Sequence, residues 1–266
     1  MTITWITKGW CQLCLAIRSW ATVNQLANLE FVRKSKRSRI GHWWSAINTG
    51  ILILILSVVF GSIFKLPNEY FLPYLSIGLI IWFHINTVLV SASGLYPENR
   101  ELILQIALPR LVYVFQLWLR ESIALRYNLI IVPVVLLIVQ INLSVEIIFS
   151  VLGLILLELN LLWMIIFIAM ISVRYRDVRQ ILINILQFGF YSTPIIWERS
   201  LLELSHLDNL IVFNPFFHLI EGVRAPLLDT ATPWLSYAVA GGLALFGWLC
   251  ALYVHGRFHK RIEYWV

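Results

Sequence analysis

The basic segment from residue 33 to residue 39 is the first candidate for chemistry in the sequence. It reads Arg33-Lys34-Ser35-Lys36-Arg37-Ser38-Arg39 and precedes a long apolar run. Guanidinium and ammonium groups neutralise phosphate oxygens through charge-assisted hydrogen bonds. Arg33, Arg37 and Arg39 are therefore candidates to hold the diphosphate of a lipid-linked substrate. Cations beside a span also set its orientation and bind lipid headgroups, and this alternative stays open.

Aromatic side chains are a second candidate, because their ring faces pack against the apolar faces of sugars. Phe, Trp and Tyr make up 14% of the chain. Phe188 and Tyr191 lie three residues apart and so share one face of a predicted helix. Together with Trp44, they are the residues that we expect to line a glycan path. Aromatic residues also gather at membrane interfaces and in helix packing, and this alternative stays open for each ring.

Four polar residues fall inside apolar runs. His84 and Asn86 lie in one run, and Glu158 and Asn160 lie in another. Polar groups inside a membrane are costly and often functional. Hydrogen bonding between helices is the commoner explanation for such residues. We therefore expect interhelical hydrogen bonds here before function.

Several catalytic motifs are absent from the sequence. It contains no G-x-x-x-x-G-K-[ST] segment to cradle ATP phosphates and no H-E-x-x-H metal motif. Asp177, Asp208 and Asp229 form no D-x-D pair, which argues against a metal-dependent glycosyltransferase. Cys11 and Cys14 form a C-x-x-C that lacks the further ligands of a zinc site and the βαβ context of a redox site. The sequence thus predicts no catalytic residue, metal or cofactor in this chain.

The elements that must position these residues are membrane-spanning helices. The chain has 60% hydrophobic and 13% charged residues, whereas soluble domains carry roughly 25% charged residues. A helix needs about 20 apolar residues to cross the hydrocarbon core of a bilayer, which is ~30 Å thick. We predict an all-α membrane protein with a six-span domain over residues 43–266. The predicted spans cover about 45–64, 71–93, 111–140, 145–173, 181–197 and 234–256.

The basic segments between the spans predict the orientation in the membrane. Arginines in the segment 174–179 lie between the fourth and fifth spans, and such clusters mark the cytoplasmic side. With six spans, both termini then lie in the cytoplasm. Of the 20 Lys and Arg residues, only Lys65, Arg199 and Arg224 fall outside segments assigned to that side. This bias explains the net charge of +6, so we expect no nucleic-acid partner.

Two segments are expected not to cross the membrane. Residues 1–42 form a cytoplasmic tail in which apolar residues recur at helical spacing from Trp20 to Phe31. This stripe predicts an amphipathic helix at the membrane interface, with a helix packed on protein as the alternative. Residues 1–19 receive no structural prediction. Residues 210–228 are apolar but broken by Pro215 and Pro226, so we expect a re-entrant helical hairpin between the fifth and sixth spans.

Three motifs carry a family resemblance. They are the turn Arg174-x-Arg176-Asp177, the end of a span at Thr193-Pro194-x-x-Trp197, and the segment 214–228. Together they resemble the membrane subunits of type-2 ABC exporters for bacterial surface polysaccharides, and the O-antigen exporters in particular. The resemblance covers the chain from Arg33 onward. Two positions depart from the family, because Ser35 stands where an aromatic residue is common and Thr49 where proline is common.

The resemblance implies roles for further residues. In that family, a short helix between the second and third spans docks on the ATPase. The corresponding residues here are Pro97, Glu98, Asn99, Arg100, Glu101, Pro109 and Arg110. The family also has an outer gate. Its counterparts here are Phe213, Asn214, Pro215, Phe216, His218, Glu221 and Arg224.

The resemblance also implies an assembly. Two copies of the chain would pair in the bacterial inner membrane with two nucleotide-binding ATPase subunits, which supply ATP and Mg. The assembly would move undecaprenyl-diphosphate-linked O-antigen polysaccharide, with membrane lipids as further partners. Exporters of capsule or teichoic acid, and a membrane-embedded transferase for lipid-linked sugars, stay open as alternatives. An ion-coupled carrier is disfavoured, since Glu158 and His84 are its only ionisable candidates at mid-membrane.

Overall fold

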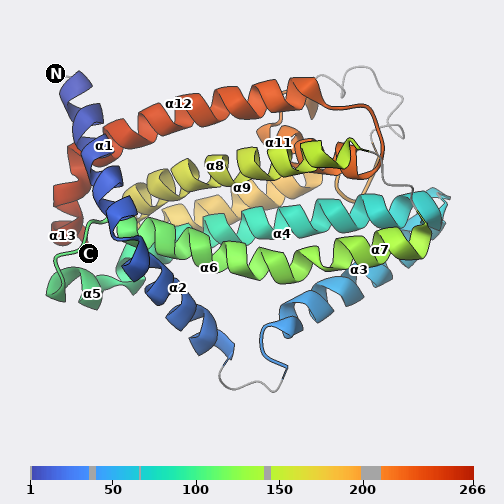
Figure 1. Cartoon of the computed structure of the whole chain (residues 1–266), viewed down its shortest axis with the longest axis horizontal. Coiled ribbons are helices and arrows are strands. Elements are labelled where there is room, and N and C mark those ends of the chain that lie inside the picture. Colours follow the sequence, from blue (N-terminus) through green and yellow to red (C-terminus); the bar gives the residue numbers. More distant parts are fainter. Residues whose placement is uncertain (1, 36–39, 66, 141–144, 199–210) are drawn as a thin grey trace.

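The computed structural model describes residues 2–35, 40–65, 67–140, 145–198 and 211–266. These residues form helices and turns, with no strand among them. The helices are α1 (Thr2–Arg18), α2 (Trp20–Ser35), α3 (Trp43–Phe64), α4 (Asn68–Glu98), α5 (Arg100–Gln105), α6 (Leu111–Leu129), α7 (Ile131–Val139), α8 (Ile147–Ser172), α9 (Val178–Ser192), α11 (Pro215–Leu227), α12 (Trp234–Phe258) and α13 (Ile262–Trp265), with a 3₁₀ turn at His259–Arg261. Both chain termini lie at one end of the bundle, which we call the terminal end; the opposite end is the far end (Figure 1).

Five helical stretches are long and apolar enough to cross a membrane. They are Trp43–Phe64, Glu69–Glu98, Leu111–Val139, Ile147–Ser172 and Trp234–Trp265. Each overlaps a span predicted from the sequence. The third is a continuous pair, α6 and α7, which meet at Ile130. A multi-pass, all-helical membrane protein is therefore confirmed.

The fifth predicted span is shorter as a helix than expected. Of residues 181–197, only those up to Ser192 are helical, since α9 has 15 residues and a length of about 22 Å. The helix ends there because Pro194 disfavours the helical conformation of the residue before it, and Thr193 is extended, with φ −98° and ψ 135°. α9 is not among the five long apolar helices, so the six-span topology stays a prediction.

Helix α4 is the centre of the bundle. In its most apolar window, 72% of residues are buried, against 17% in α3. Leu75, Ile80 and Ile85 of α4 are fully buried, and the helix contacts α3, α6, α8, α9 and α11. α4 is thus a core helix, whereas α3 presents most of its surface outward.

The first helix, α1, lies in a segment that received no structural prediction. It runs across the terminal end, nearly perpendicular to α12 (Figure 1). Glycines let the two backbones approach closely: a Cβ atom at Gly9 would overlap Leu252 O, and one at Gly256 would overlap Trp5 O. No local sequence pattern indicates this crossing, because each glycine is isolated and its partner is distant in the chain.

Helix α2 buries much of its apolar stripe on protein. Val23 and Ala27 are fully buried, the helix packs along α6, and the Trp20 ring lies 6.3 Å from that of Phe115. A helix packed on protein is the alternative that the sequence left open for this stripe. The structure agrees with that alternative, because Val23 and Ala27 are buried in the bundle, where α2 packs along α6. An interface location for α2 stays a prediction.

Helix α11 is the described part of the predicted re-entrant hairpin. Its 13 residues lie against α8, α12 and α4 toward the far end (Figure 1). A Cβ atom at Gly153 of α8 would overlap the backbone of Gly222, so the crossing depends on a residue without a side chain. Residues 199–210 lie outside the described residues, so the hairpin itself is not tested.

Candidate functional site

Five of the seven residues expected to contact an ATPase line one groove at the terminal end, which we call the docking groove. It has a volume of about 750 Å³ and lies between α2 and the α4–α5 corner. Pro97, Glu98, Asn99, Arg100 and Glu101 all line it. Asn99 fixes the corner, because its side-chain amide donates to Leu95 O at 2.8 Å. The exposed charges of Arg100 and Glu101 are thus presented on a rigid turn.

Arg110 and Pro109 lie outside this groove. Arg110 is buried and forms an ion pair with Glu263 of α13. Its Nη1 also donates to Leu108 O at 3.1 Å. Arg110 therefore joins the start of α6 to the end of the chain rather than presenting its charge on the surface.

The three arginines expected to bind a diphosphate are only partly described. Arg33 is exposed and lines the docking groove, beside Glu30 and the α4–α5 corner. Arg37 and Arg39 lie outside the described residues. The structure therefore places Arg33 with the docking residues and does not test a shared phosphate site.

Two of the predicted glycan-path residues and four of the predicted gate residues meet in one cavity, which we call the aromatic pocket. It has a volume of about 540 Å³. Its lining combines Phe188 and Tyr191 of α9 with Trp197, Phe213, Asn214, Pro215 and Phe216. Phe188, Tyr191 and Phe213 are strongly exposed, so their ring surfaces are open to a ligand. Trp44 lies elsewhere, half exposed at the start of α3.

Asn214 organises the gate side of this pocket. Its Oδ1 accepts from Phe216 N at 3.0 Å and caps α11, and Pro215 occupies the first helical turn. These are preferred residues for a helix start. The Asn214 amide also donates to Thr193 Oγ1 at 2.8 Å. One side chain thus fixes the start of α11 to the end of α9.

Arg224 holds the irregular segment after α9 in place. The side chain is 2% exposed; Nη1 donates to Pro194 O at 2.8 Å, and Nε donates to Glu221 Oε2 at 3.1 Å. Its guanidinium carbon lies 3.9 Å from the ring centroid of Tyr74. The Tyr74 hydroxyl lies 2.9 Å from the same Pro194 oxygen. Tyr74 was missed by the sequence analysis, since no local pattern links it to residue 194.

His218, one of the predicted gate residues, has a structural role. It is buried; Nδ1 lies 2.9 Å from Ser236 Oγ, and Nε2 lies 2.6 Å from Val212 O. Because a carbonyl only accepts, Nε2 carries the proton and Nδ1 accepts from the serine. His218 therefore joins α11 to α12.

Glu158 contacts three polar side chains from two neighbouring helices. It accepts from Trp118 Nε1 at 2.6 Å and from Ser122 Oγ at 3.4 Å, and its Oε1 lies 2.9 Å from His84 Nε2. The three partners come from α6 and α4, and Glu158 from α8. This fits the expectation of interhelical hydrogen bonding for His84 and Glu158, and Trp118 is a partner that the sequence did not reveal.

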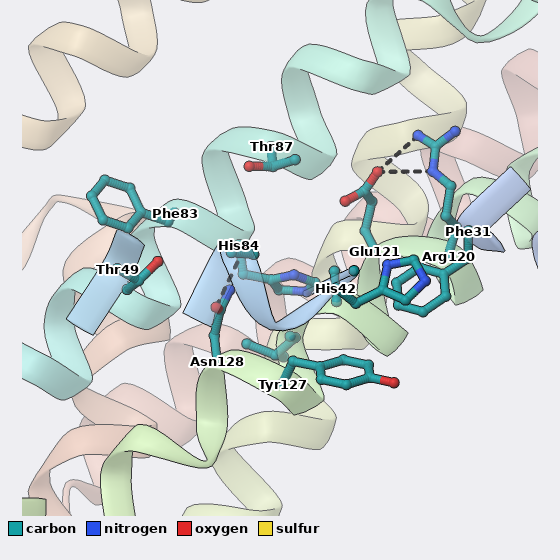
Figure 2. Close-up of a pocket in the computed structure, with 14 residues that line it drawn as sticks. Phe31, His42, Thr49, Phe83, His84, Thr87, Arg120, Glu121, Tyr127 and Asn128 are labelled. Atoms are coloured by element: carbon teal, nitrogen blue, oxygen red, sulfur yellow. Dashed lines mark hydrogen bonds and ion pairs between the residues drawn. The ribbon is translucent and has the colours of Figure 1, made fainter. Parts of the chain in front are cut away.

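A further cavity, the polar pocket, opens between α2, α3, α4 and α6 (Figure 2). Its volume is about 400 Å³. Arg120 and Glu121 form an ion pair at its edge, with 2.8 Å between Nη2 and Oε1. The Phe31 and His42 rings stack at 3.4 Å beside Tyr127. Burial lowers the pKa of His42, which keeps this ring uncharged near pH 7.

The apolar spans, the charged corner at one end and the aromatic pocket are features expected of the membrane component of a transporter. The chain belongs to the ABC-2 type transporter family, whose model matches residues 22–228. It is also similar to the O-antigen export system permease protein RfbA of Myxococcus xanthus, with 22% identity over 229 residues. That alignment covers 78% of this chain and 80% of the relative. The resemblance to type-2 ABC permeases is thus confirmed, and family members of this kind work with an ATPase partner.

Proposed function

We propose that the chain is the pore-forming subunit of an ATP-driven exporter that moves undecaprenyl-diphosphate-linked O-antigen polysaccharide across the bacterial inner membrane. The aromatic pocket carries this proposal, because it joins Phe188 and Tyr191 to the start of α11. Exposed rings bind sugar faces without fixing one register, which suits a polymer that must slide. Exporters of capsule or teichoic acid would need the same architecture, so these two polymers are the alternative cargoes.

The proposed topology has six crossings. α9 and the irregular segment Thr193–Trp197 together form the fifth, and residues 211–228, which include α11, belong to a re-entrant hairpin at the outer face. The terminal end is then cytoplasmic, which agrees with the basic segments 257–261 at the end of α12 and 174–179 at the start of α9.

The proposed assembly contains two copies of the chain. α3 exposes Leu54 and Val58 at 58% and 66%, and α9 exposes Phe188 at 75%. Two such faces brought together would enclose a path between the copies. Each copy would dock on one ATPase through the docking groove, and nucleotide-driven movement of α5 would pass directly into α4.

The first experiment is purification of the tagged chain from its native membrane, followed by mass determination and an ATP-hydrolysis assay on the same fraction. A two-plus-two complex that hydrolyses ATP, and does so faster with undecaprenyl-linked O-antigen, is the expected result. A complex stimulated only by capsule or teichoic acid precursors would reassign the cargo. A chain that purifies without an ATPase and transfers sugars without ATP would overturn the exporter function.

A further inference from the structure

A cavity at the crossing of α1 and α12, which we call the basic pocket, takes part in none of the proposed steps of export. Its volume is about 480 Å³, and ligand sites commonly occupy about 300 to 1,000 Å³. One wall comes from residues 5–12 of α1 and the other from residues 256–261, which meet at the terminal end (Figure 1). Gly256 lines the pocket, and its close approach to the Trp5 backbone holds the two walls together.

The lining of the basic pocket carries an excess of positive charge. Its long basic side chains are Lys8, Arg257, Lys260 and Arg261. No Asp or Glu residue lines the pocket, and none of these four cations forms an ion pair with a carboxylate in the described part of the chain. The undescribed residues with acidic side chains fall in the segment 199–210, which continues from Glu198 beside Tyr70, near the start of α4 at the far end (Figure 1). The pocket is therefore suited to an anion.

Two of the cations are oriented by aromatic side chains rather than by opposite charges. Lys8 Nζ lies 4.4 Å from the ring centroid of Trp5. Arg257 Nη1 donates to the Tyr253 hydroxyl at 3.0 Å, and the guanidinium carbon lies 5.2 Å from the ring centroid of Phe258. Such contacts position a cation without neutralising it. Both side chains thus keep donors for phosphate oxygens, which form charge-assisted hydrogen bonds with them.

His259 reduces the repulsion that an anion would meet at the end of α12. Its Nδ1 lies 3.1 Å from His255 O and 3.2 Å from Gly256 O. Because carbonyl oxygens only accept, Nδ1 carries the proton and donates to this pair. Unpaired carbonyls in the last turn of a helix concentrate partial negative charge. His259, which also lines the pocket, therefore partly neutralises the one end of α12 that would disfavour an anion.

The position of the pocket along α12 favours a lipid over a soluble anion. Arg257 lies about 35 Å along the helix from Trp234, its first residue, slightly more than the ~30 Å of the hydrocarbon core. This is the depth of the phospholipid headgroups. Phe246 and Leu249 lie on the side of α12 that carries Arg257 and are 68% and 56% exposed. An acyl chain attached to a phosphate at Arg257 would lie along this apolar surface.

We propose that the basic pocket binds the phosphate of an anionic phospholipid, with one acyl chain along α12. In the proposed topology this lipid belongs to the cytoplasmic leaflet, and the inference rests on that topology only for the choice of leaflet. The lipid is a bound component rather than cargo. The site is separate from the aromatic pocket, the docking groove and the basic segment 33–39. By contacting both walls, the lipid stabilises the crossing of α1 and α12.

The lipid selectivity is tested on the purified full chain in a neutral detergent. The probes are phosphatidylglycerol and, with the same acyl chains, zwitterionic phosphatidylcholine. Native mass spectrometry should show one retained phosphatidylglycerol per chain, with phosphatidylcholine retained at least about tenfold more weakly. Phosphatidylglycerol should also raise the melting temperature, whereas millimolar inorganic phosphate should not. Equal retention of the two lipids would overturn the charge selection, and an equal shift with inorganic phosphate would reassign the pocket to a soluble anion.

Matched variants separate the pocket from the net charge of the chain. The pair Lys8→Gln and Arg257→Gln removes two cations of the pocket and should weaken retention of phosphatidylglycerol at least about tenfold. The pair Arg18→Gln and Arg176→Gln removes the same charge from exposed positions outside it and should leave retention within about twofold. Melting of the lipid-free chain should not change in either pair, since neither Lys8 nor Arg257 has a carboxylate partner among the described residues.

Three results would refute the site. The first is unchanged retention in the pocket pair, and the second is an equal loss in both pairs, which would show a response to net charge alone. The third is loss of the lipid when the ATPase is bound, which would assign the pocket to a protein interface. Because neither ATP hydrolysis nor transport is measured, the lipid site and the export function can fail independently.

Discussion

Arg224 contacts three parts of the structure from one buried position. It binds the carbonyl of Pro194, pairs with Glu221 on its own helix and lies over the ring of Tyr74. A buried cation with this many partners is costly to disturb, because removing one partner leaves the others unpaired. The segment after α9 is therefore held by Arg224 together with Tyr74 and Asn214.

Replacement of Arg224 with glutamine should lower stability by about 3 kcal/mol, because Glu221 is left without its partner. Arg224→Lys should recover only part of this, since an ammonium group cannot reproduce the planar fork. Thermal unfolding in detergent measures both effects. Arg176→Gln, at an exposed arginine, is the matched control and should melt like the unmodified chain; an equal loss in that variant would show that charge alone is responsible.

Glu158→Leu should destabilise the bundle by about 2 to 4 kcal/mol, because Trp118, His84 and Ser122 lose their common acceptor. Glu158→Gln keeps an acceptor and should cost less. A double-mutant cycle with His84→Leu isolates the contribution of that pair. Independent, additive effects of the two substitutions would contradict the arrangement.

At the scale of elements, the position of α11 depends on close backbone contact with α8. A side chain at Gly153 would overlap the Gly222 carbonyl. Overpacking of a tight contact typically costs about 1 to 3 kcal/mol. Gly153→Val should therefore displace α11 and lower both the melting temperature and export, whereas Gly242→Val should change neither. Unchanged melting of Gly153→Val would mean that the two helices are not in contact.

The α5 corner carries a separate prediction about coupling. Arg100→Glu reverses an exposed charge in the docking groove and should reduce export at least about tenfold while the chain stays folded in the membrane. Arg110→Glu places a carboxylate against Glu263, so it should lower stability as well as export. Co-purification of the ATPase with each variant is the measurement. Full export by Arg100→Glu would remove this corner from the docking surface.

The sequence predicted the elements better than their contacts. The long apolar spans followed from composition and length. Pro215 was read only as a break in an apolar run, whereas the structure places it at the start of α11. Helix α1 was not predicted, because its buried face depends on Gly9 meeting α12. The early end of α9 was also missed. It is caused by Pro194, and a count of apolar residues does not include the effect of a proline on the helix. Arg110 was expected at the surface, since its partner Glu263 is remote in sequence. The crossing of α1 with α12 and the pair of Arg110 with Glu263 are tertiary contacts that no local pattern encodes, whereas the end of α9 is a local effect of Pro194.

At the scale of the whole molecule, the terminal end and the far end should lie on opposite sides of the membrane. After replacement of Cys11, Cys14 and Cys250 by serine, Lys260→Cys should react with a membrane-impermeant maleimide only in inverted vesicles. Ala231→Cys, between α11 and α12, should react in intact spheroplasts. Labelling of both sites from the same side would contradict six crossings.

The crossing of α1 and α12 also bears on how the chain is made. α1 leaves the ribosome before α12, but its packing surface at Gly9 is completed only by Leu252 and Gly256 of α12. The native arrangement of α1 therefore forms only after α12 has been inserted, and a chain interrupted before α12 carries an unassembled helix that quality-control proteases can recognise.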